Sequence, residues 1–166
     1  MDATLKGQAG KYGTLLHGDV KGANIVFSNR PSDTQDARSR CALYDFQYVG
    51  VGLVTRDLVY FLGTTAQSGL LRNVEQEKEL LRAYHADLIQ SVGLRLDHRR
   101  ELPEMTTDDE KEIDYPFSKL WDHWELALVD WCRFMAGWGF WGNDSWVERR
   151  AKQIAVEWDS NGFPCL

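Results

Sequence analysis

The pattern of apolar and polar positions predicts a short β region near the start of the chain. Two apolar runs, over residues 15–16 and 24–27, flank the segment HGDVKGA, whose glycines permit a sharp irregular loop. A polar, turn-rich segment over residues 28–40 then leads to a further apolar run at residues 41–44. We therefore predict that residues 24–27 and 41–44 form an antiparallel hairpin with a long loop.

The rest of the chain has helical periodicity. An apolar helical run begins near Asp57, and a further helix over residues 74–92 has one apolar face and one charged face. The apolar face of that second helix comprises Leu80, Leu81, Tyr84, Leu88 and Ile89. Another stripe with three- and four-residue steps comprises Leu120, Trp124, Leu128, Trp131, Met135 and Trp138. A last helix is expected near residues 145–158, packed beside that stripe, and residues 97–114 are expected to be a polar connection. These patterns predict an α+β fold.

The first residues differ from this pattern. Residues 1–13 are rich in glycine and polar side chains, which predicts a linker or a disordered start. The domain is therefore expected to span residues 14–166.

Composition restricts the class of function. With 43% hydrophobic and 27% charged residues among 166, the chain is typical of one packed domain. A net charge of −6 argues against a general binder of nucleic acid or anionic membranes and favours a cationic or neutral ligand. The cysteines Cys41, Cys132 and Cys165 are odd in number and lack a CxxC pair, which indicates neither a disulfide framework nor a zinc site. The start has no signal-peptide core and no run approaches the about 18 apolar residues of a membrane span, so we expect a cytoplasmic location.

The predicted hairpin suggests a site for a divalent cation. Asn24 enters one strand and Asp45 leaves the other, so antiparallel pairing would bring both to one end of the hairpin. An amide and a carboxylate oxygen suit Mg²⁺, which takes few protein ligands and completes its octahedron with water and phosphate oxygens. Asp19, in the adjoining loop, could accept a proton from an attacking hydroxyl and orient it.

The same residues carry a resemblance to a known group of enzymes. The segment HGDVKGAN, residues 17–24, matches the HxDxxxxN catalytic loop of kinase-like phosphotransferases, and DFQ at residues 45–47 stands where their DFG tripeptide would. The HGD form is similar to that of aminoglycoside phosphotransferases, choline kinases and choline-kinase-like proteins. RDLVYFLG, residues 56–63, and ELLRAYHADLIQSVG, residues 79–93, also resemble segments of these families. The resemblance covers most of residues 14–93 and, more loosely, the helical remainder.

This resemblance implies a mostly helical C-terminal lobe of a protein kinase-like fold. It makes Asp19 the catalytic base, and Asn24 and Asp45 the ligands of an Mg²⁺ ion that bridges the phosphates of ATP. His17 would support the loop. Lys21 would neutralise the transferred phosphate, although it could equally be an exposed loop lysine.

Two departures from the family pattern are visible. Gln47 replaces the DFG glycine, so a protein-kinase-like flip of this segment is not assumed, while metal binding by Asp45 is unaffected. Neither GxGxxG nor a Walker A sequence is present, and GVGLV at residues 50–54 has the wrong place and pattern for a phosphate-covering loop. We therefore expect that the N-terminal nucleotide-binding lobe is absent, and that this segment alone is a poor enzyme.

Simpler structural roles compete with several of these assignments. His17 and Asp19 could anchor the loop without any chemistry. For Asp57 we favour a structural role, at a helix N-terminus or as a backbone anchor for the catalytic loop. The seven tryptophans are mainly expected in the core, although Trp138, Phe140 and Trp141 could form a cation–π cage for a quaternary ammonium.

The function predicted from the sequence is transfer of phosphate from ATP, with Mg²⁺, to a hydroxyl of a small molecule such as an aminoglycoside or choline. Its expected partners are that acceptor and an N-terminal lobe or partner chain, with no nucleic acid and no membrane. A non-catalytic kinase-like binding or scaffolding module, or an incomplete gene product, is the main alternative. A metal hydrolase using His17, Asp19 and Asp45 is disfavoured because His17 has no second histidine nearby. The acceptor and the oligomeric state stay open.

Overall fold

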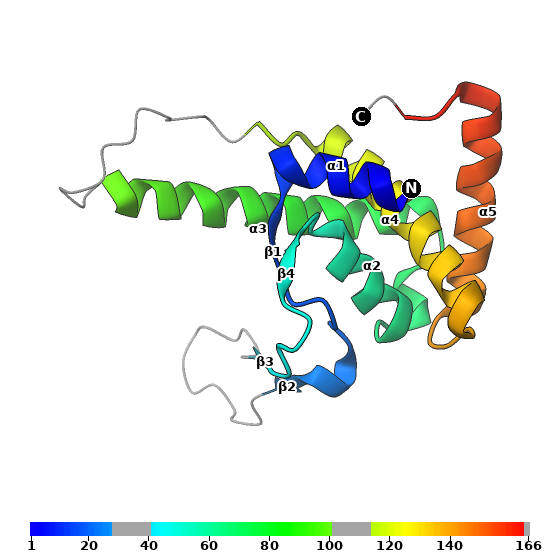
Figure 1. The fold of residues 1–166 in the computed structure, drawn as a ribbon, viewed down its shortest axis with the longest axis horizontal. Helices are drawn as coiled ribbons and strands as arrows, with labels where there is room; N and C mark the ends of the chain where they lie inside the picture. The colour runs from blue at the N-terminus through cyan, green and yellow to red at the C-terminus, as the bar shows by residue number, and fades with distance from the viewer. Residues whose placement is uncertain (28–40, 101–113, 165–166) are drawn as a thin grey trace.

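The computed structural model describes residues 1–27, 41–100 and 114–164. Within these ranges the chain forms five α-helices and four short strands, an α+β architecture that confirms the predicted class (Figure 1). The helices are α1 (Asp2–Tyr12), α2 (Thr55–Thr64), α3 (Val74–Arg100), α4 (Phe117–Trp138) and α5 (Asp144–Asn161). The strands are β1 (Thr14–Leu16), β2 (Ile25–Phe27), β3 (Cys41–Leu43) and β4 (Gly50–Gly52), and short 3-10 turns cover Gly22–Asn24 and Ser68–Leu70. In the described ranges, no helix combines the length and the apolar character needed to cross a bilayer.

The four strands form two separate antiparallel ribbons. β2 pairs with β3, with Ile25 opposite Leu43 and Phe27 opposite Cys41, which confirms the predicted hairpin. Its long loop, residues 28–40, lies outside the described residues. β1 pairs with β4, a pairing that the sequence did not predict. At Gly52 a Cβ atom would lie 2.7 Å from Leu16 Cδ1, so the glycine permits the two strands to approach.

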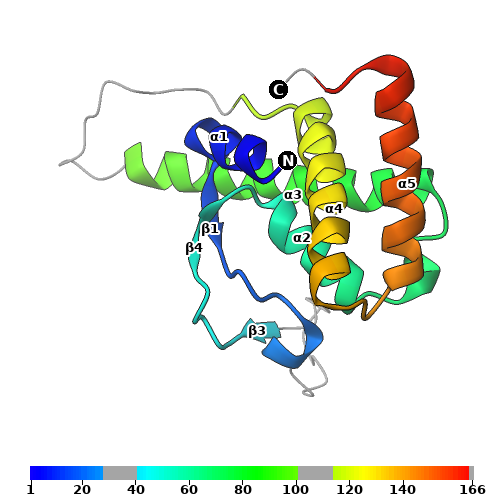
Figure 2. The same cartoon turned by 45° about the vertical axis from the view of Figure 1, so that its right-hand side comes forward.

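The helices enclose the core, with α4 in contact with both α2 and α5 (Figure 2). The predicted stripe on α4 is buried at Leu120, Trp124, Leu128 and Met135, each with no exposed surface. Trp138 departs from this prediction because 78% of its surface is exposed. It is the last residue of α4. The predicted helices over residues 74–92 and 145–158 are confirmed by α3 and α5.

The prediction of a linker over residues 1–13 is wrong. Asp2–Tyr12 is a helix, and Leu5 is buried in the core with 1% of its surface exposed. The Tyr12 ring packs against Tyr115, with 5.1 Å between centroids, and against His123, at 5.3 Å. Two interior glycines lower the intrinsic helix propensity, but contacts made by a few apolar side chains override it.

A buried ion pair joins α3 to α5. Arg150 Nε donates hydrogen bonds to both oxygens of Glu77, at 2.8 and 2.9 Å, and Trp146 Nε1 donates a third at 3.1 Å. Glu77 is 1% exposed and Arg150 is 3% exposed. Because charges buried this deeply need mutual compensation, the pair fixes the register between the two helices.

Candidate active site

The loop that links β1 to β2, residues 17–24, is anchored by a single carboxylate of α2. The backbone N–H of His17 donates to Asp57 Oδ2 at 2.7 Å, and that of Gly18 donates to Asp57 Oδ1 at 3.0 Å. Gly18 has a φ of +82°, and a Cβ there would lie 2.3 Å from the carbonyl oxygen of Tyr48. Glycine is therefore required at this position. The hydrogen bonds confirm the favoured interpretation of Asp57 as a backbone anchor.

His17 connects this loop to the end of the hairpin. Its buried ring accepts a hydrogen bond at Nδ1 from the Asp19 backbone N–H, at 3.3 Å. Since Nδ1 acts as an acceptor, the other nitrogen carries the proton, and Nε2 donates to the Tyr44 carbonyl at 2.9 Å. The ring also packs against Phe46, with centroids 4.8 Å apart. These contacts hold the shape of the loop.

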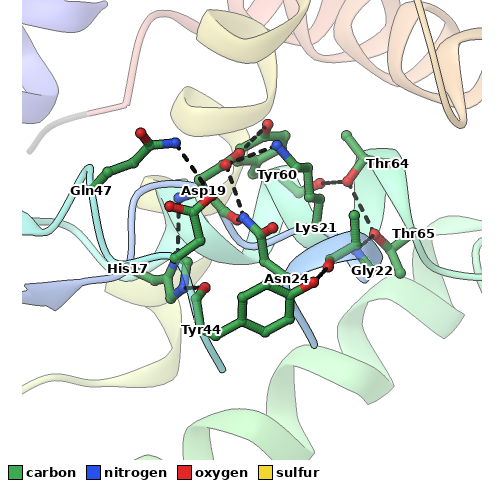
Figure 3. Close-up of polar contacts among 12 residues, drawn as sticks. His17, Asp19, Lys21, Gly22, Asn24, Tyr44, Gln47, Tyr60, Thr64 and Thr65 are labelled. Atoms are coloured by element: carbon green, nitrogen blue, oxygen red, sulfur yellow. Dashed lines mark hydrogen bonds and ion pairs between the residues drawn. The ribbon is translucent and has the colours of Figure 1, made fainter. Parts of the chain in front are cut away.

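Asp19 lies at the centre of a hydrogen-bond network (Figure 3). Only 4% of its surface is exposed, and its carboxylate accepts bonds from three side chains. Lys21 Nζ donates to Oδ2 at 2.8 Å, Asn24 Nδ2 to Oδ2 at 2.9 Å, and the Tyr60 hydroxyl to Oδ1 at 2.6 Å. Burial raises the pKa of Asp19, but the hydrogen bonds from Lys21, Tyr60 and Asn24 outweigh it and lower that pKa overall. Asp19 is therefore a carboxylate at neutral pH, able to orient a hydroxyl.

Lys21 and Asn24, which follow Asp19 in the same loop, both donate hydrogen bonds to its carboxylate. The Lys21 side chain is 41% exposed, and its hydrogen bond to Asp19 raises its pKa, so the amine stays charged. Asn24 is buried and uses Nδ2 twice, because this group also donates to the Asp19 carbonyl at 2.9 Å. With the amide nitrogen held in this way, Asn24 Oδ1 is the atom of that side chain available to a cation.

Asp45 lies directly beyond β3, at the same end of the hairpin as Asn24. The Tyr44 backbone N–H donates to the Asn24 carbonyl at 3.1 Å, which places Asp45 one residue past the position opposite Asn24. Asp45 is exposed, interacts electrostatically with Lys21, and accepts a hydrogen bond at Oδ2 from Gln47 Nε2 at 3.3 Å. Its φ of +64° makes it the one non-glycine residue with positive φ in the described ranges. Such a conformation costs about 1–3 kcal/mol and is frequent at functional sites.

The donor set fits a magnesium ion that is shared with a substrate. In the parts of the chain that the structure describes, no three His, Cys, Asp or Glu side chains are grouped to hold a metal. Asn24 Oδ1 and the Asp45 carboxylate would supply two oxygen ligands and leave the other positions to water and phosphate oxygens. An amide and a carboxylate oxygen are donors of the kind that Mg²⁺ takes in proteins.

Several residues of the site were missed from the sequence. Tyr60 of α2 binds Asp19, and burial, followed by its bond to Asp19, raises the Tyr60 pKa well above its usual value. Thr65 Oγ1 accepts from the Gly22 backbone N–H at 2.7 Å, and the Tyr44 hydroxyl donates to the Ala23 carbonyl. Tyr60 is three residues after Asp57, so helical spacing puts both on one face and could have indicated it.

The part of the chain that carries this site matches a known family. The model described as the ecdysteroid kinase-like family matches residues 1–95. The chain belongs to the ecdysteroid kinase-like family. This family is part of the protein kinase-like superfamily, so a kinase-like transferase is the class shown for the chain. The match does not single out aminoglycoside phosphotransferases or choline kinases. Neither the curated proteins nor the solved structures searched contain a match.

The matched region of this ecdysteroid kinase-like chain contains α1, all four described strands, α2 and much of α3. It therefore includes every residue of the site proposed from the sequence. α4 and α5 lie outside the matched residues.

Proposed function

We propose that this ecdysteroid kinase-like chain is the C-terminal lobe of a kinase-like fold that transfers the γ-phosphate of ATP to a hydroxyl of a small molecule. The observation that carries this proposal is the Asp19 carboxylate, held by three donors, with Asn24 and Asp45 at the adjoining end of the hairpin. Positioning and electrostatics supply most of the rate in phosphoryl transfer, and this arrangement supports both.

In the proposed reaction, Asp19 accepts a hydrogen bond from the acceptor hydroxyl and directs its oxygen toward the γ-phosphorus. A new P–O bond forms as the bond to the β–γ bridging oxygen breaks, ADP leaves, and the hydroxyl proton passes to Asp19. Lys21, which pairs with Asp19 at 2.8 Å, would neutralise charge on the transferred group. Asn24 Oδ1 and Asp45 would hold Mg²⁺, which neutralises the phosphates when bound.

The proposed acceptor is a small molecule with a free hydroxyl. An aminoglycoside, choline or a related compound follows from the motif resemblance, and the family name adds ecdysteroids.

A second folded unit, an N-terminal lobe or a partner chain, is proposed to complete the nucleotide site. Leu15 and Val51, cross-strand partners on the β1–β4 ribbon, are 72% and 77% exposed, and Phe27 of the other ribbon is 63% exposed. Apolar surface of this kind marks an interface. The isolated chain is accordingly proposed to turn over slowly, because a nucleotide held from one side loses near-attack geometry.

Nucleotide binding tests the proposal without requiring turnover. Isothermal titration calorimetry with ATP should show binding to the wild-type chain with Mg²⁺ and much weaker binding with EDTA. Asp45→Ala should abolish the Mg²⁺-dependent part, since one of two proposed protein ligands is lost. Asp87→Ala, which removes an exposed carboxylate from α3, is the matched control and should bind normally. Equal binding by wild type and Asp45→Ala would reject the proposed site and favour the binding or scaffolding module.

A further inference from the structure

The C-terminal end of α2 lies against the turn that joins α4 to α5. Gly142 in this turn has a φ of +71°, and a Cβ atom there would lie 2.5 Å from the Gly63 carbonyl oxygen and 2.7 Å from Thr64 Cα. No other side chain fits at these distances, so glycine is required where the two segments meet. The shape of the turn is therefore matched to the end of this helix.

Asn143, the next residue, pairs with carbonyl groups at this end of α2. Its side-chain Nδ2 donates to the Leu62 carbonyl at 2.8 Å and to the Ala66 carbonyl at 2.7 Å. Its backbone N–H donates to the Gly63 carbonyl at 2.7 Å. Carbonyls in the last turn of a helix lack an intrahelical partner, and Leu62 and Gly63 are both buried. Because an unpaired buried carbonyl is costly, these hydrogen bonds fix the end of α2.

The end of α2 in turn holds the second half of the loop over residues 17–24 (Figure 3). Thr65 Oγ1 accepts a hydrogen bond from the Gly22 backbone N–H at 2.7 Å. Thr64 Oγ1 lies 3.2 Å from Thr65 Oγ1 and donates its own proton to the Tyr60 carbonyl at 2.7 Å. The Thr65 hydroxyl proton therefore points to Thr64, which leaves the Thr65 oxygen as the acceptor for Gly22.

Gly22 lies between the two loop residues that bind the Asp19 carboxylate. Lys21 Nζ and Asn24 Nδ2 donate to Asp19 Oδ2 at 2.8 and 2.9 Å. Gly22–Asn24 forms a single 3-10 turn, and the Asn24 backbone N–H donates to the Lys21 carbonyl at 2.8 Å. A displacement of Gly22 would therefore move both of these residues relative to Asp19.

We propose that Asn143 and Thr65 are positioning residues, which act through the end of α2 on the loop over residues 17–24. This inference rests on the proposed function for its consequence in phosphate transfer, whereas the geometry of the loop is measurable without a nucleotide. Asn143 lies at the start of α5, outside the residues 1–95 that match the family. The support of the site therefore extends into the C-terminal helices.

Amide hydrogen exchange at Gly22, followed by NMR on the whole chain, tests the contact with Thr65. Thr65→Val keeps the shape of the side chain and removes the acceptor, so the Gly22 N–H should exchange roughly 2- to 12-fold faster, the net worth of one hydrogen bond. Thr65→Ser keeps the hydroxyl and should restore most of the protection. Thr55→Val is the matched control, because the Thr55 hydroxyl has no hydrogen-bond partner among the described residues. It should exchange like wild type at Gly22.

Asn143→Ala tests the link across α2. We expect faster exchange at Gly22, and no further increase when this substitution is combined with Thr65→Val, because Asn143 acts through Thr65. Asn73→Ala is the matched control. It removes the side-chain oxygen that accepts from the Gln76 backbone N–H at 3.0 Å, so it takes a helix cap from α3 and leaves α2 untouched. Its exchange at Gly22 should equal that of wild type.

Three exchange results would overturn the inference. They are unchanged exchange at Gly22 in Thr65→Val, no recovery in Thr65→Ser, and equal effects of Asn143→Ala and Asn73→Ala. Mg²⁺-dependent ATP affinity should fall in Thr65→Val and recover in Thr65→Ser, and a wild-type affinity in Thr65→Val would also overturn the inference. Absence of ATP binding by the wild-type chain would instead reject the proposed function, and exchange at Gly22 would then decide the role of Asn143 and Thr65 in the loop.

Discussion

Replacing Tyr60 by phenylalanine would test whether its hydroxyl holds Asp19 in the charged state. The substitution keeps the ring that packs on Trp131 and removes only the donor that lies 2.6 Å from Asp19 Oδ1. A hydrogen bond to a charged group contributes about 1.5–3 kcal/mol. We therefore expect a loss of roughly that size in the free energy of unfolding at pH 7.

The pH dependence identifies the source of this loss. The folded pKa of Asp19 is lowered, so the stability it contributes is present above its unfolded pKa, near 3.8, and is lost as pH falls through the folded value. In Tyr60→Phe the Asp19 pKa should rise toward its ordinary value, because one of the hydrogen bonds that favour the charged carboxylate is lost. The stability difference from wild type should accordingly shrink under acid conditions, where Asp19 is protonated in both proteins.

Urea unfolding at a series of pH values, with carbon NMR of the Asp19 carboxyl group, measures both quantities. Tyr115→Phe is the control, because the Tyr115 hydroxyl pairs with His123 Nδ1 at 3.0 Å and not with Asp19. Its Asp19 titration should match wild type. If Tyr60→Phe lost the same stability at all pH values, with an unchanged Asp19 titration, Tyr60 would contribute packing alone and the reasoning would be refuted.

Three other substitutions test the scaffold. Asp57→Ala leaves two backbone N–H groups of the loop without their acceptor, at a cost of about 1–3 kcal/mol each. The melting temperature and the affinity for ATP should therefore both fall. An unchanged affinity for ATP would show that the loop keeps its shape without Asp57. Glu77→Ala removes the closer of two carboxylates beside the Arg150 guanidinium, which lie at 2.8 Å (Glu77) and 3.8 Å (Glu125), and should cost about 3–5 kcal/mol in urea unfolding. A loss below about 1 kcal/mol would mean that Glu125 or water compensates the Arg150 charge. Leu5→Ala should cost about 2–5 kcal/mol by the same measurement, and no loss would show that α1 is dispensable.

The parts of the fold that the sequence predicted depend on patterns repeated over several residues. The α4 stripe gives several apolar positions in phase, and the hairpin has two apolar runs separated by a turn-rich segment. The β1–β4 ribbon could not be recognised in this way, because β1 and β4 are separated by the whole β2–β3 hairpin and β4 begins and ends with glycine. Glycine gives no apolar position to detect, and the pairing of the two strands is set by tertiary contacts.

The sequence predicted the site residues that belong to one motif, because the spacing within the motif places them in the same loop. His17, Asp19, Lys21 and Asn24 share one loop, and the hairpin register brings Asp45 to the same end. The donation from Tyr60 to Asp19 joins residues 41 positions apart, and it requires the docking of α2, which local sequence does not specify. The burial of Leu5 is likewise a tertiary contact, which explains why a glycine-rich start was mistaken for a linker.

The hydrogen bond from the His17 backbone N–H to Asp57 joins residues that are 40 positions apart in the sequence. The loop over residues 17–24 therefore takes its ordered shape only when α2 has packed against it. Before α2 packs against the loop, the backbone N–H groups of His17 and Gly18 lack their acceptor. In a nascent chain that has not yet folded, the loop would therefore be unordered. The dependence is reciprocal by mass action, because any ligand that bound only the closed loop would also stabilise the docked helix, as the proposed nucleotide would. Under this linkage, ligand-induced protection from proteolysis would extend into α2, beyond the residues that touch the nucleotide.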